Sequence, residues 1–449
     1  MDLVKNWWYT STTKEKTVQI LVVLLVFTYS AYINNASISI AAGLAATYIL
    51  YDCYQKKSFS GFHMAKENWL GLAVFLGSVF LASLLVGDKA SIHMAFRYVY
   101  WALPFLLAAY LGKLADIRYA AAVGGLFSVA VTSVNVAYLN YLLLHGHKLV
   151  GPGGPVVGRR LGAFLSNPNH YSVLLICTLP LLLCFYMDKK LRSNPLVFTI
   201  SIAVTILGLW SLWKTGSRGA MIGLFAGGLS VFALFCFFRK QGKLFRNGLT
   251  VGAAIVAVVL LAGIQGGETR TGDAARLRQL KSCYAMWQDH KLLGVGLENW
   301  QKEYAAHYVL KDEIRQEILQ RYFGGKKAAS KQEADRIAAW QNAAIKHESA
   351  YPTPHNVFAW FFSTTGALGG IGYLLFVVYY CKLLCSRIKD NSKEWILYVG
   401  IWALLAITIH GLVDVGITNK EAARLIFLLL GIVLNLRYID REEPLAESR

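Results

Sequence analysis

The sequence predicts an all-α polytopic membrane protein with about twelve transmembrane helices and one long helical segment outside the membrane. Three observations carry this prediction. The 449 residues are 55% hydrophobic, and their mean hydropathy is +0.43. Apolar runs long enough to cross the hydrocarbon core of a bilayer recur along the chain. Basic residues gather in alternate short connections between these runs, which is the charge pattern of cytoplasmic loops.

Twelve apolar runs define the predicted transmembrane helices. The first run is not a cleaved signal peptide, because it lacks a small-x-small cleavage site and a second apolar run follows almost at once. The twelve runs cover residues 17–34, 36–51, 69–87, 93–112, 118–144, 169–187, 196–213, 217–238, 248–264, 355–384, 395–415 and 422–438.

The chain divides into four predicted parts. Residues 1–264 hold the first nine transmembrane helices, and residues 265–354 form a loop domain with amphipathic helices outside the membrane. Residues 355–438 hold the last three transmembrane helices, and residues 439–449 form a cytoplasmic tail. Long loops such as the second part are exempt from the positive-inside count.

The formal net charge of +19 raises the question of a nucleic-acid partner. The distribution of the charge argues against this class, because topology and attraction to anionic lipid account for most of it. Counting twelve helices places the basic loops and both termini on the cytoplasmic side. The basic residues of these loops are Lys56, Lys57, Lys66, Lys113, Arg118, Lys189, Lys190, Arg192, Arg239, Lys240, Lys243, Arg246, Arg387, Lys389 and Lys393.

The sequence predicts neither a metal site nor a cofactor. Of the seven cysteines, Cys53 lies in a cytoplasmic loop and Cys283 alone lies in the long outer segment, which therefore cannot form an internal disulfide. No Cys/His cluster has zinc spacing. An Asp-x-Asp pair, a P-loop, a GxSxG motif and an HExxH motif are also missing. Any chemistry would therefore rest on cationic side chains and an imidazole.

The concentrated polarity of the chain falls in three segments that are predicted to lie on the outer side. Residues 145–169 are rich in glycine and proline, so they cannot be helical throughout. They include Arg159 and Arg160, which follow a GPGGP turn. Residues 214–220, with the sequence KTGSRGA, form a short connection. The third and longest segment is residues 265–354.

The long outer segment is predicted to contain two helices and a turn. Apolar residues at three- and four-residue steps predict an amphipathic helix, whose stripe packs either on the membrane surface or on the helix bundle. A second helix is expected near residues 328–347. Between them, residues 292–300 predict a turn at Gly294 and Gly296. The apolar positions of the first helix are Leu277, Leu280, Tyr284 and Trp287.

Glycines recur every four residues at Gly219, Gly223 and Gly227, and the spacing returns at Gly366 and Gly370. Small residues four apart let helix backbones approach closely in lipid. We therefore expect these glycines to serve helix packing and to carry no chemistry.

Arg218 is the first candidate functional residue. It lies where the eighth apolar helix begins, after Ser217, which can cap that helix. An arginine beside a helix N-terminus makes a site for a phosphate-like anion. The alternative is an arginine that only marks the membrane interface.

His355 is the second candidate. Thr353 is expected to cap the following helix, with Pro354 at the first helical position and His355 and Asn356 in the first turn. A helix N-terminus disfavours a protonated imidazole, and the neutral imidazole is the form that a general base needs. A lipid-borne substrate would arrive at this boundary. The alternative is an interfacial histidine that only hydrogen-bonds a loop.

Further polar residues lie near the same predicted face. Arg276 lies at the start of the amphipathic helix, and Arg278, two residues on, faces another way. His410 and Asp414 are four apart and share a face of the eleventh helix. A carboxylate within the membrane is costly without a partner, so Asp414 marks either a functional site or a structural ion pair with an arginine.

Four stretches of the chain recur together in one known family. They are RRLGAFLSNPNHYS (159–172), TGSRGAMIGL (215–224), ARLRQLKSCYAMWQDHKLLGVGLENW (275–300) and PHNVFAWFFSTTGALGGIGYLLF (354–376). Together they resemble the O-antigen ligase and O-antigen polymerase superfamily of bacterial inner-membrane glycosyltransferases. Each motif alone is weak, but their order and spacing agree with that family, and the resemblance covers most of the chain from about residue 155 to 380.

The resemblance implies a GT-C-like architecture and a reaction at the periplasmic face that needs no nucleotide sugar and no metal. The donor would be a glycan on undecaprenyl diphosphate, and the acceptor a sugar hydroxyl of lipid A–core. Arg218 and Arg276 match the family's two arginines, which would neutralise the departing diphosphate. His355 matches the histidine of the His-Asn pair, which would activate the acceptor hydroxyl or orient the diphosphate. We add as substrate-binding candidates Arg159, Arg160, Asn356, Arg278 and Asp414.

The resemblance leaves alternatives open. Ligases and polymerases share these residues, so chain polymerisation is the second choice. A protein O-oligosaccharyltransferase is the third choice, because those members usually carry a longer C-terminal outer region than the short segment expected here after the last helix. Lys291 stands where many members have proline before the GxG turn, which puts the local loop geometry in doubt. A transporter or flippase is the alternative from another class, and it would place charged groups near mid-membrane on broken helices.

Overall fold

The computed structural model describes residues 11–147, 156–157, 160–245, 247–248, 271–325, 328 and 330–435. Arg159, the tail 439–449 and all but the first residue of the predicted ninth helix (248–264) lie outside these ranges.

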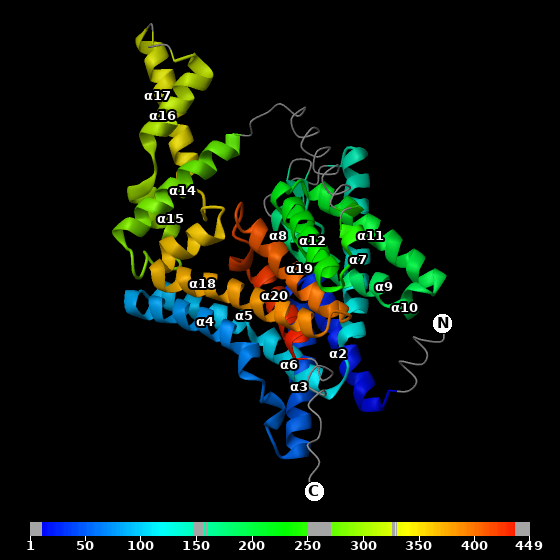
Figure 1. Ribbon diagram of the computed structural model, residues 1–449. Helices are drawn as coiled ribbons and strands as arrows, with labels where there is room; N and C mark the ends of the chain where they lie inside the picture. Colours follow the sequence, from blue (N-terminus) through cyan, green and yellow to red (C-terminus); the bar gives the residue numbers. More distant parts are fainter. Residues whose placement is uncertain are drawn as a thin grey trace.

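The described residues form a helical bundle, so the predicted all-α class is confirmed (Figure 1). The only strands among them are the two-residue pair β1 (Val156–Val157) and β2 (Arg160–Leu161), which pair antiparallel. The helices of the bundle are α2 (Thr13–Ala31), α3 (Asn35–Lys56), η1 (Ser60–Phe62), α4 (Lys66–Val86), α5 (Lys89–Trp101), α6 (Leu103–Leu114), α7 (Arg118–Leu144), α8 (Pro168–Thr178), η2 (Leu179–Leu182), α9 (Leu183–Met187), α10 (Lys189–Arg192), α11 (Pro195–Thr215), α12 (Arg218–Phe238), α18 (Val357–Asp390), α19 (Trp395–His410), η4 (Gly416–Thr418) and α20 (Lys420–Leu434).

Eight helices of the described ranges are long and apolar enough to cross a membrane, which makes the chain a multi-pass membrane protein. The count of twelve stays a prediction. Two predicted runs are interrupted by proline, which removes a backbone donor and clashes with the preceding turn. The run 93–112 divides into α5 and α6 just before Pro104, and the run 169–187 changes to 3-10 geometry at Pro180.

The centre of the bundle is formed by α19 and α20, whose side chains are buried on nearly every side. Around them α12 packs on α19, α6 packs on α20, and α4 packs on α18. The outer helices direct large apolar side chains away from the protein, as Ile40, Ile206 and Ile222 do. In a membrane protein these exposed side chains meet lipid, so the apolar surface needs no protein partner.

The glycine stripe of α12 serves close packing, as predicted. A Cβ at Gly223 would lie 2.5 Å from the carbonyl oxygen of Ala406 on α19, and one at Gly227 would lie 3.0 Å from the Trp402 ring. Only glycine allows the two backbones to approach this closely. The stripe therefore fixes where the N-terminus of α12 lies against the end of α19.

Gly366 has a different role from the one predicted for it. It has a positive φ of 61° and kinks α18, so it does not form a packing stripe with Gly370. The backbone groups that the kink frees bind the predicted turn at 292–300. The N–H of Val295 donates to Ser363 O at 2.9 Å, and the N–H of Ala367 donates to Lys291 O at 2.7 Å. The turn thereby joins α14 to α18.

Outside the bundle lie α14 (Thr271–Asp289), α15 (Trp300–Glu303), the π-helical turn η3 (Tyr304–Tyr308), α16 (Lys311–Phe323) and α17 (Lys331–Ser349). Figure 1 shows α14 beside α18, with α16 and α17 extending away from the bundle. The amphipathic helix and the second helix were predicted, whereas α16 was not. The sequence of α16 is mostly polar, so it lacks the apolar period by which a helix is recognised.

Candidate functional site

His355 lies immediately before a helix rather than in its first turn. Asn356, not Thr353, is the N-cap of α18, because its side-chain oxygen accepts the Ala359 N–H at 2.8 Å. The helix then begins at Val357. His355 takes a left-handed backbone conformation with φ of 51°, which is uncommon for a residue other than glycine. The prediction of a first-turn histidine is wrong, because an asparagine is a better cap than a threonine three residues earlier.

Three consecutive contacts hold this segment against the end of α19. The N–H of Val357 donates to Gly411 O at 2.7 Å, and Nδ2 of Asn356 donates to Leu412 O at 2.9 Å. Nδ1 of His355 then lies 3.5 Å from Oδ1 of Asp414. The amide of Asn356 is thus occupied at both ends by backbone groups, which makes it a structural residue of this junction.

Asp414 lies in the connection after α19, not within the helix as predicted, and only 9% of its surface is exposed. Its Oδ2 accepts from Nδ2 of Asn169 at 2.9 Å, and its Oδ1 accepts the N–H of Val415 at 2.8 Å. Burial by itself raises the pKa of this carboxyl. The adjacent imidazole of His355 and the nearby imidazole of His410 outweigh burial and hold the pKa of Asp414 well below its usual range.

Arg160 continues this hydrogen-bond chain. Its Nη2 donates to Oδ1 of Asn169, and its Nε donates to Thr215 O at 2.6 Å. Thr215 ends α11, and Gly216 follows it with φ of 61°. A Cβ at Gly216 would lie 3.2 Å from the Arg160 side chain, so the arginine lies directly over the turn between α11 and α12.

Arg218 opens α12 just beyond this turn. Ser217 caps the helix, as predicted, by accepting the Ala220 N–H at 3.4 Å. The Arg218 side chain is exposed, and no hydrogen bond or ion pair joins it to the described residues. A Cβ at Gly219 would collide with Val413, so the N-terminus of α12 lies beside the turn that carries Asp414. An unpaired arginine at a capped helix N-terminus can bind an anion.

Arg276 approaches the same region from α14. It is half-buried and lies within electrostatic range of His410. Burial and the carboxylate of Glu348 raise the pKa of Tyr351, and the positive charge of Arg276 opposes that rise. The ring of Tyr351 packs edge-on against His355, with 5.7 Å between the centroids. The fold therefore gathers Arg276, His355 and Asp414 around Tyr351 and His410.

Arg278 has a structural environment, unlike Arg276. Its Nε and Nη2 donate to the two carboxylate oxygens of Glu348 at 2.9 and 2.6 Å, and its Nη1 donates to Glu317. Only 8% of the arginine and 4% of Glu348 are exposed. The ion pair joins α14 to α16 and α17. We therefore revise the expected substrate contact of Arg278, because its guanidinium is already occupied by carboxylates.

The site contains residues that the sequence did not single out. Asn169 lies within the quoted NPNH motif, which was the available signal, and it occupies the first turn of α8 after the cap Asn167. Tyr351 precedes the Pro-Thr-Pro segment, and no motif or periodicity in the sequence marked it as part of the site. Of the eight candidate residues, Arg159 alone lies outside the described ranges.

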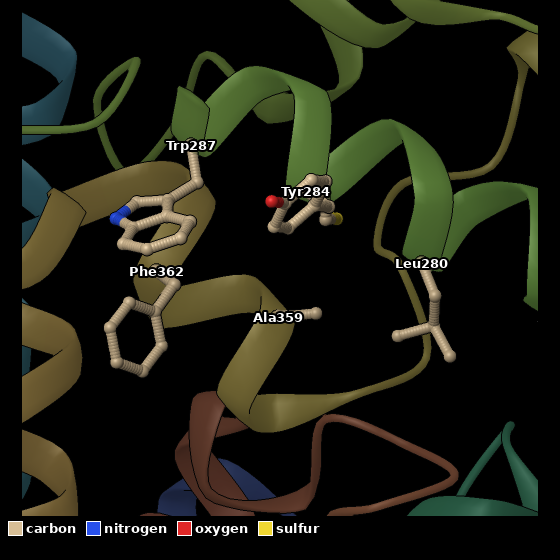
Figure 2. A pocket seen from close by; sticks show the side chains of 6 residues that line it. Leu280, Tyr284, Trp287, Ala359 and Phe362 are labelled. Atoms are coloured by element: carbon tan, nitrogen blue, oxygen red, sulfur yellow. The ribbon is translucent and has the colours of Figure 1, made fainter. Parts of the chain in front are cut away.

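An apolar groove runs between α14 and α18 beside these residues. It has a volume of about 320 Å³ and is lined by Leu280, Cys283, Tyr284, Trp287, Ala359 and Phe362. Figure 2 shows the side chains of α14 directed across the gap toward those of α18. Leu280 lies one helical turn after Arg276, and Ala359 lies four residues after His355. The groove therefore extends from the polar cluster along the same two elements.

Residues 203–374 match a protein family described as O-antigen ligase. The matched segment runs from α11 to the middle of α18 and includes Arg218, Arg276 and His355. It ends before Asp414 and begins after Arg160. No curated protein shows a significant match to the chain. The family match confirms the resemblance to the O-antigen ligase and polymerase superfamily.

Proposed function

We propose that this chain, a member of the O-antigen ligase and polymerase superfamily through residues 203–374, is an O-antigen ligase. It would transfer a glycan from undecaprenyl diphosphate to a sugar hydroxyl of lipid A–core. The reaction would take place at the periplasmic face of the bacterial inner membrane, with residues 265–354 forming the periplasmic loop domain. The family match supports a lipid-linked glycan as the substrate and the membrane as the environment of the reaction.

The observation that carries the proposal is the convergence of two arginines and a histidine beside an apolar groove. Arg218 lies at a capped helix N-terminus, and Arg276 reaches the surroundings of His355 from a different helix. A diphosphate carries the negative charge that such a pair of arginines would bind. The groove next to them suits a hydrocarbon chain, because its lining is almost wholly apolar.

The proposed reaction is a displacement at the anomeric carbon of the donor sugar. The acceptor oxygen forms the new glycosidic bond while the bond between that carbon and the diphosphate oxygen breaks. The diphosphate leaves with the electron pair, and Arg218 and Arg276 stabilise the charge that develops on it. The acceptor hydroxyl gives its proton to His355, which acts as the general base.

The apolar groove would receive the first isoprene units of the lipid. Leu277 and Tyr284 of α14 are exposed, with 57% and 62% of their surfaces accessible. An amphipathic helix with such a face lies at the membrane interface. The lipid chain could thus enter the groove from the bilayer while its diphosphate stays with the arginines.

The test is transfer in proteoliposomes that contain the purified protein. Undecaprenyl-diphosphate-linked glycan is supplied with lipid A–core, and the expected product is core that carries the glycan. Deletion of the gene should remove polymer from the core while lipid-linked polymer accumulates. Lipid A–core that stays unmodified in the liposomes, with an active control ligase alongside, would contradict the ligase proposal.

The second candidate is an O-antigen or exopolysaccharide polymerase, because the family match is shared by both activities. A polymerase would lengthen the lipid-linked glycan in the same liposomes without any lipid A–core. Its deletion should leave single repeat units on the core. A transporter would instead move the lipid-linked glycan across the bilayer and form no new glycosidic bond.

A further inference from the structure

The polar cluster contains a continuous chain of side chains that ends at His355. It begins at Arg160, passes through Asn169 to Asp414, and reaches Nδ1 of the imidazole. These residues come from β2, the start of α8 and the turn after α19. Because each of these elements contributes one group, only the tertiary fold brings the chain together.

We propose that Asp414 is a positioning residue that holds His355 in one tautomer, with the hydrogen on Nδ1 and the lone pair on Nε2. Asn169 and Arg160 hold the carboxylate in place. A carboxylate that accepts from one imidazole nitrogen leaves the other as the acceptor, which is the form that a general base needs. The consequence for catalysis rests on the proposed function, whereas the tautomer itself does not.

The carboxylate is well suited to this role because it cannot rotate freely. Asn169 binds Oδ2 and the Val415 N–H binds Oδ1, so the oxygen that faces His355 is fixed. Nδ1 of His355 is buried and has no hydrogen-bond partner among the described residues, and Oδ1 of Asp414 is the acceptor that faces it. Its distance of 3.5 Å to Oδ1 is longer than a hydrogen bond, and catalytic hydrogen bonds commonly tighten when substrate binds.

Two observations argue against a direct substrate contact by Asp414. The side chain is nine-tenths buried and both of its oxygens already accept hydrogen bonds. A carboxylate would also repel the diphosphate of the donor. The same reasoning applies to Arg160, whose Nε and Nη2 are held by Thr215 and Asn169. Asp414 and Arg160 therefore hold other residues of the site in place and do not contact the substrate.

The backbone of His355 supports the same conclusion. A non-glycine residue with φ of 51° persists only where its surroundings determine the conformation, and such residues cluster at functional sites. Here the contacts of Asn356 and Val357 with the end of α19 hold the backbone. His355 thus takes the left-handed conformation directly before the cap of α18, and its imidazole faces Asp414.

Other charged and titratable groups surround the pair and enter the interpretation of any titration. Tyr351 packs on the imidazole, and His410 lies beside Asp414. Arg276 acts on both of these neighbours, and His170 lies within electrostatic range of His410. A measurement that reports the His355 nitrogens directly avoids these contributions.

The first test is nitrogen NMR of histidine-labelled protein in nanodiscs, with His355→Gln used to assign the His355 signals. At a pH where the imidazole is neutral, the wild type should show the hydrogen on Nδ1. In Asp414→Asn the amide can donate to Nδ1, so the hydrogen should move to Nε2. Identical tautomers in the wild type and Asp414→Asn would overturn the proposal. Asn169→Ala provides a second variant if Asp414→Asn fails to fold, and it should give a mixture of tautomers.

The second test is a double-mutant cycle in the transfer assay. Asp414→Asn should lower kcat about 10²-fold or more while KM stays within a few-fold. In the His355→Gln background the same change should cause no further loss, because Asp414 acts through His355. Losses that multiply in the double variant would mean that Asp414 acts on the substrate independently. Asp52→Asn is the matched control, since Asp52 is a buried carboxylate paired with Lys14 and Lys56 in another part of the fold.

The two tests separate failure of this proposal from failure of the proposed function. A wild-type protein without transfer activity would refute the function, and the NMR result would still decide whether Asp414 positions His355. Normal transfer by Asp414→Asn, together with an unchanged tautomer, would refute the positioning role and leave the function intact.

Discussion

Nδ1 of His355 lies 3.5 Å from Oδ1 of Asp414, across the junction between the start of α18 and the turn after α19. The carboxylate attracts a positively charged imidazole, whereas the N-terminus of α18 repels it. Hydrogen bonds of the neighbouring residues 356 and 357 fix this junction. The pair is therefore held by backbone contacts and does not depend on flexible side chains alone.

Replacement of Arg218 or Arg276 by lysine should impair transfer at equal expression, because lysine cannot form the bidentate contacts of a guanidinium. Replacement by alanine should remove a charge-assisted contact worth about 1.5–3 kcal/mol, or roughly ten- to a hundredfold in rate. Arg97→Lys is a suitable control, since Arg97 is an exposed arginine with only a 3.9 Å contact to Glu298. Full activity of both lysine variants would rule out the proposed diphosphate clamp.

Arg278→Ala should destabilise the protein by about 3–5 kcal/mol, because it leaves Glu348 buried and unpaired. The double variant Arg278→Met with Glu348→Leu should recover much of this loss, since it removes both charges. Thermal unfolding in detergent measures the effect. Transfer by the stable double variant should be near normal. A large loss of activity in that folded variant would show that Arg278 contacts the substrate, as expected from the sequence.

Ala359→Phe should fill the groove between α14 and α18 and weaken binding of donors with long polyprenyl chains. The expected result is a raised KM for the undecaprenyl donor and little change for a donor with a very short chain. Ile371→Phe is the control, because Ile371 is an exposed residue of the same helix that does not line the groove. An equal effect on both donors would show that the groove does not receive the lipid.

The transfer rate should fall as the pH is lowered, because protonation removes the lone pair of His355. Asp414 should not contribute to this loss, because its pKa lies below its usual range. The stability that Asp414 contributes is present above the ordinary carboxyl pKa of about 3.9 and disappears only as the pH falls through the lower folded value.

His355→Gln should lose about 10²–10⁴-fold in rate. A near-normal rate in His355→Gln would exclude the general-base role. A wild-type rate that rises on acidification would instead indicate a cationic His355 that binds the diphosphate.

Gly294→Ala should separate α14 from α18. Gly294 has φ of 68°, and a Cβ there would lie 2.5 Å from the backbone nitrogen of Thr365. The left-handed conformation alone costs a non-glycine residue about 1–2 kcal/mol, and the collision adds to it. Protease accessibility of the segment after α14 should increase. Gly324→Ala is the control, because Gly324 also has a positive φ but no neighbour within 4 Å.

The sequence by itself determined the class of protein and most of its helices. Apolar runs predict membrane helices because the bilayer demands about twenty apolar residues in a row and leaves no alternative for the backbone polar groups. The Ser217 cap and the glycine stripe of α12 were also predictable, because a cap residue and a four-residue glycine spacing are patterns of residues close in the chain. The motif order around Arg218, Arg276 and His355 further indicated the family.

Only the tertiary structure decided which of the candidate residues act together. Arg276 and Arg278 are two residues apart and equally basic, yet the guanidinium of Arg278 is held by Glu317 and Glu348, whereas Arg276 lies within electrostatic range of Tyr351 and His410. Asn169 and Asp414 meet because α8 and the end of α19 pack together. Such contacts depend on the angles and positions at which helices pack together, and a local pattern of residue types does not determine these.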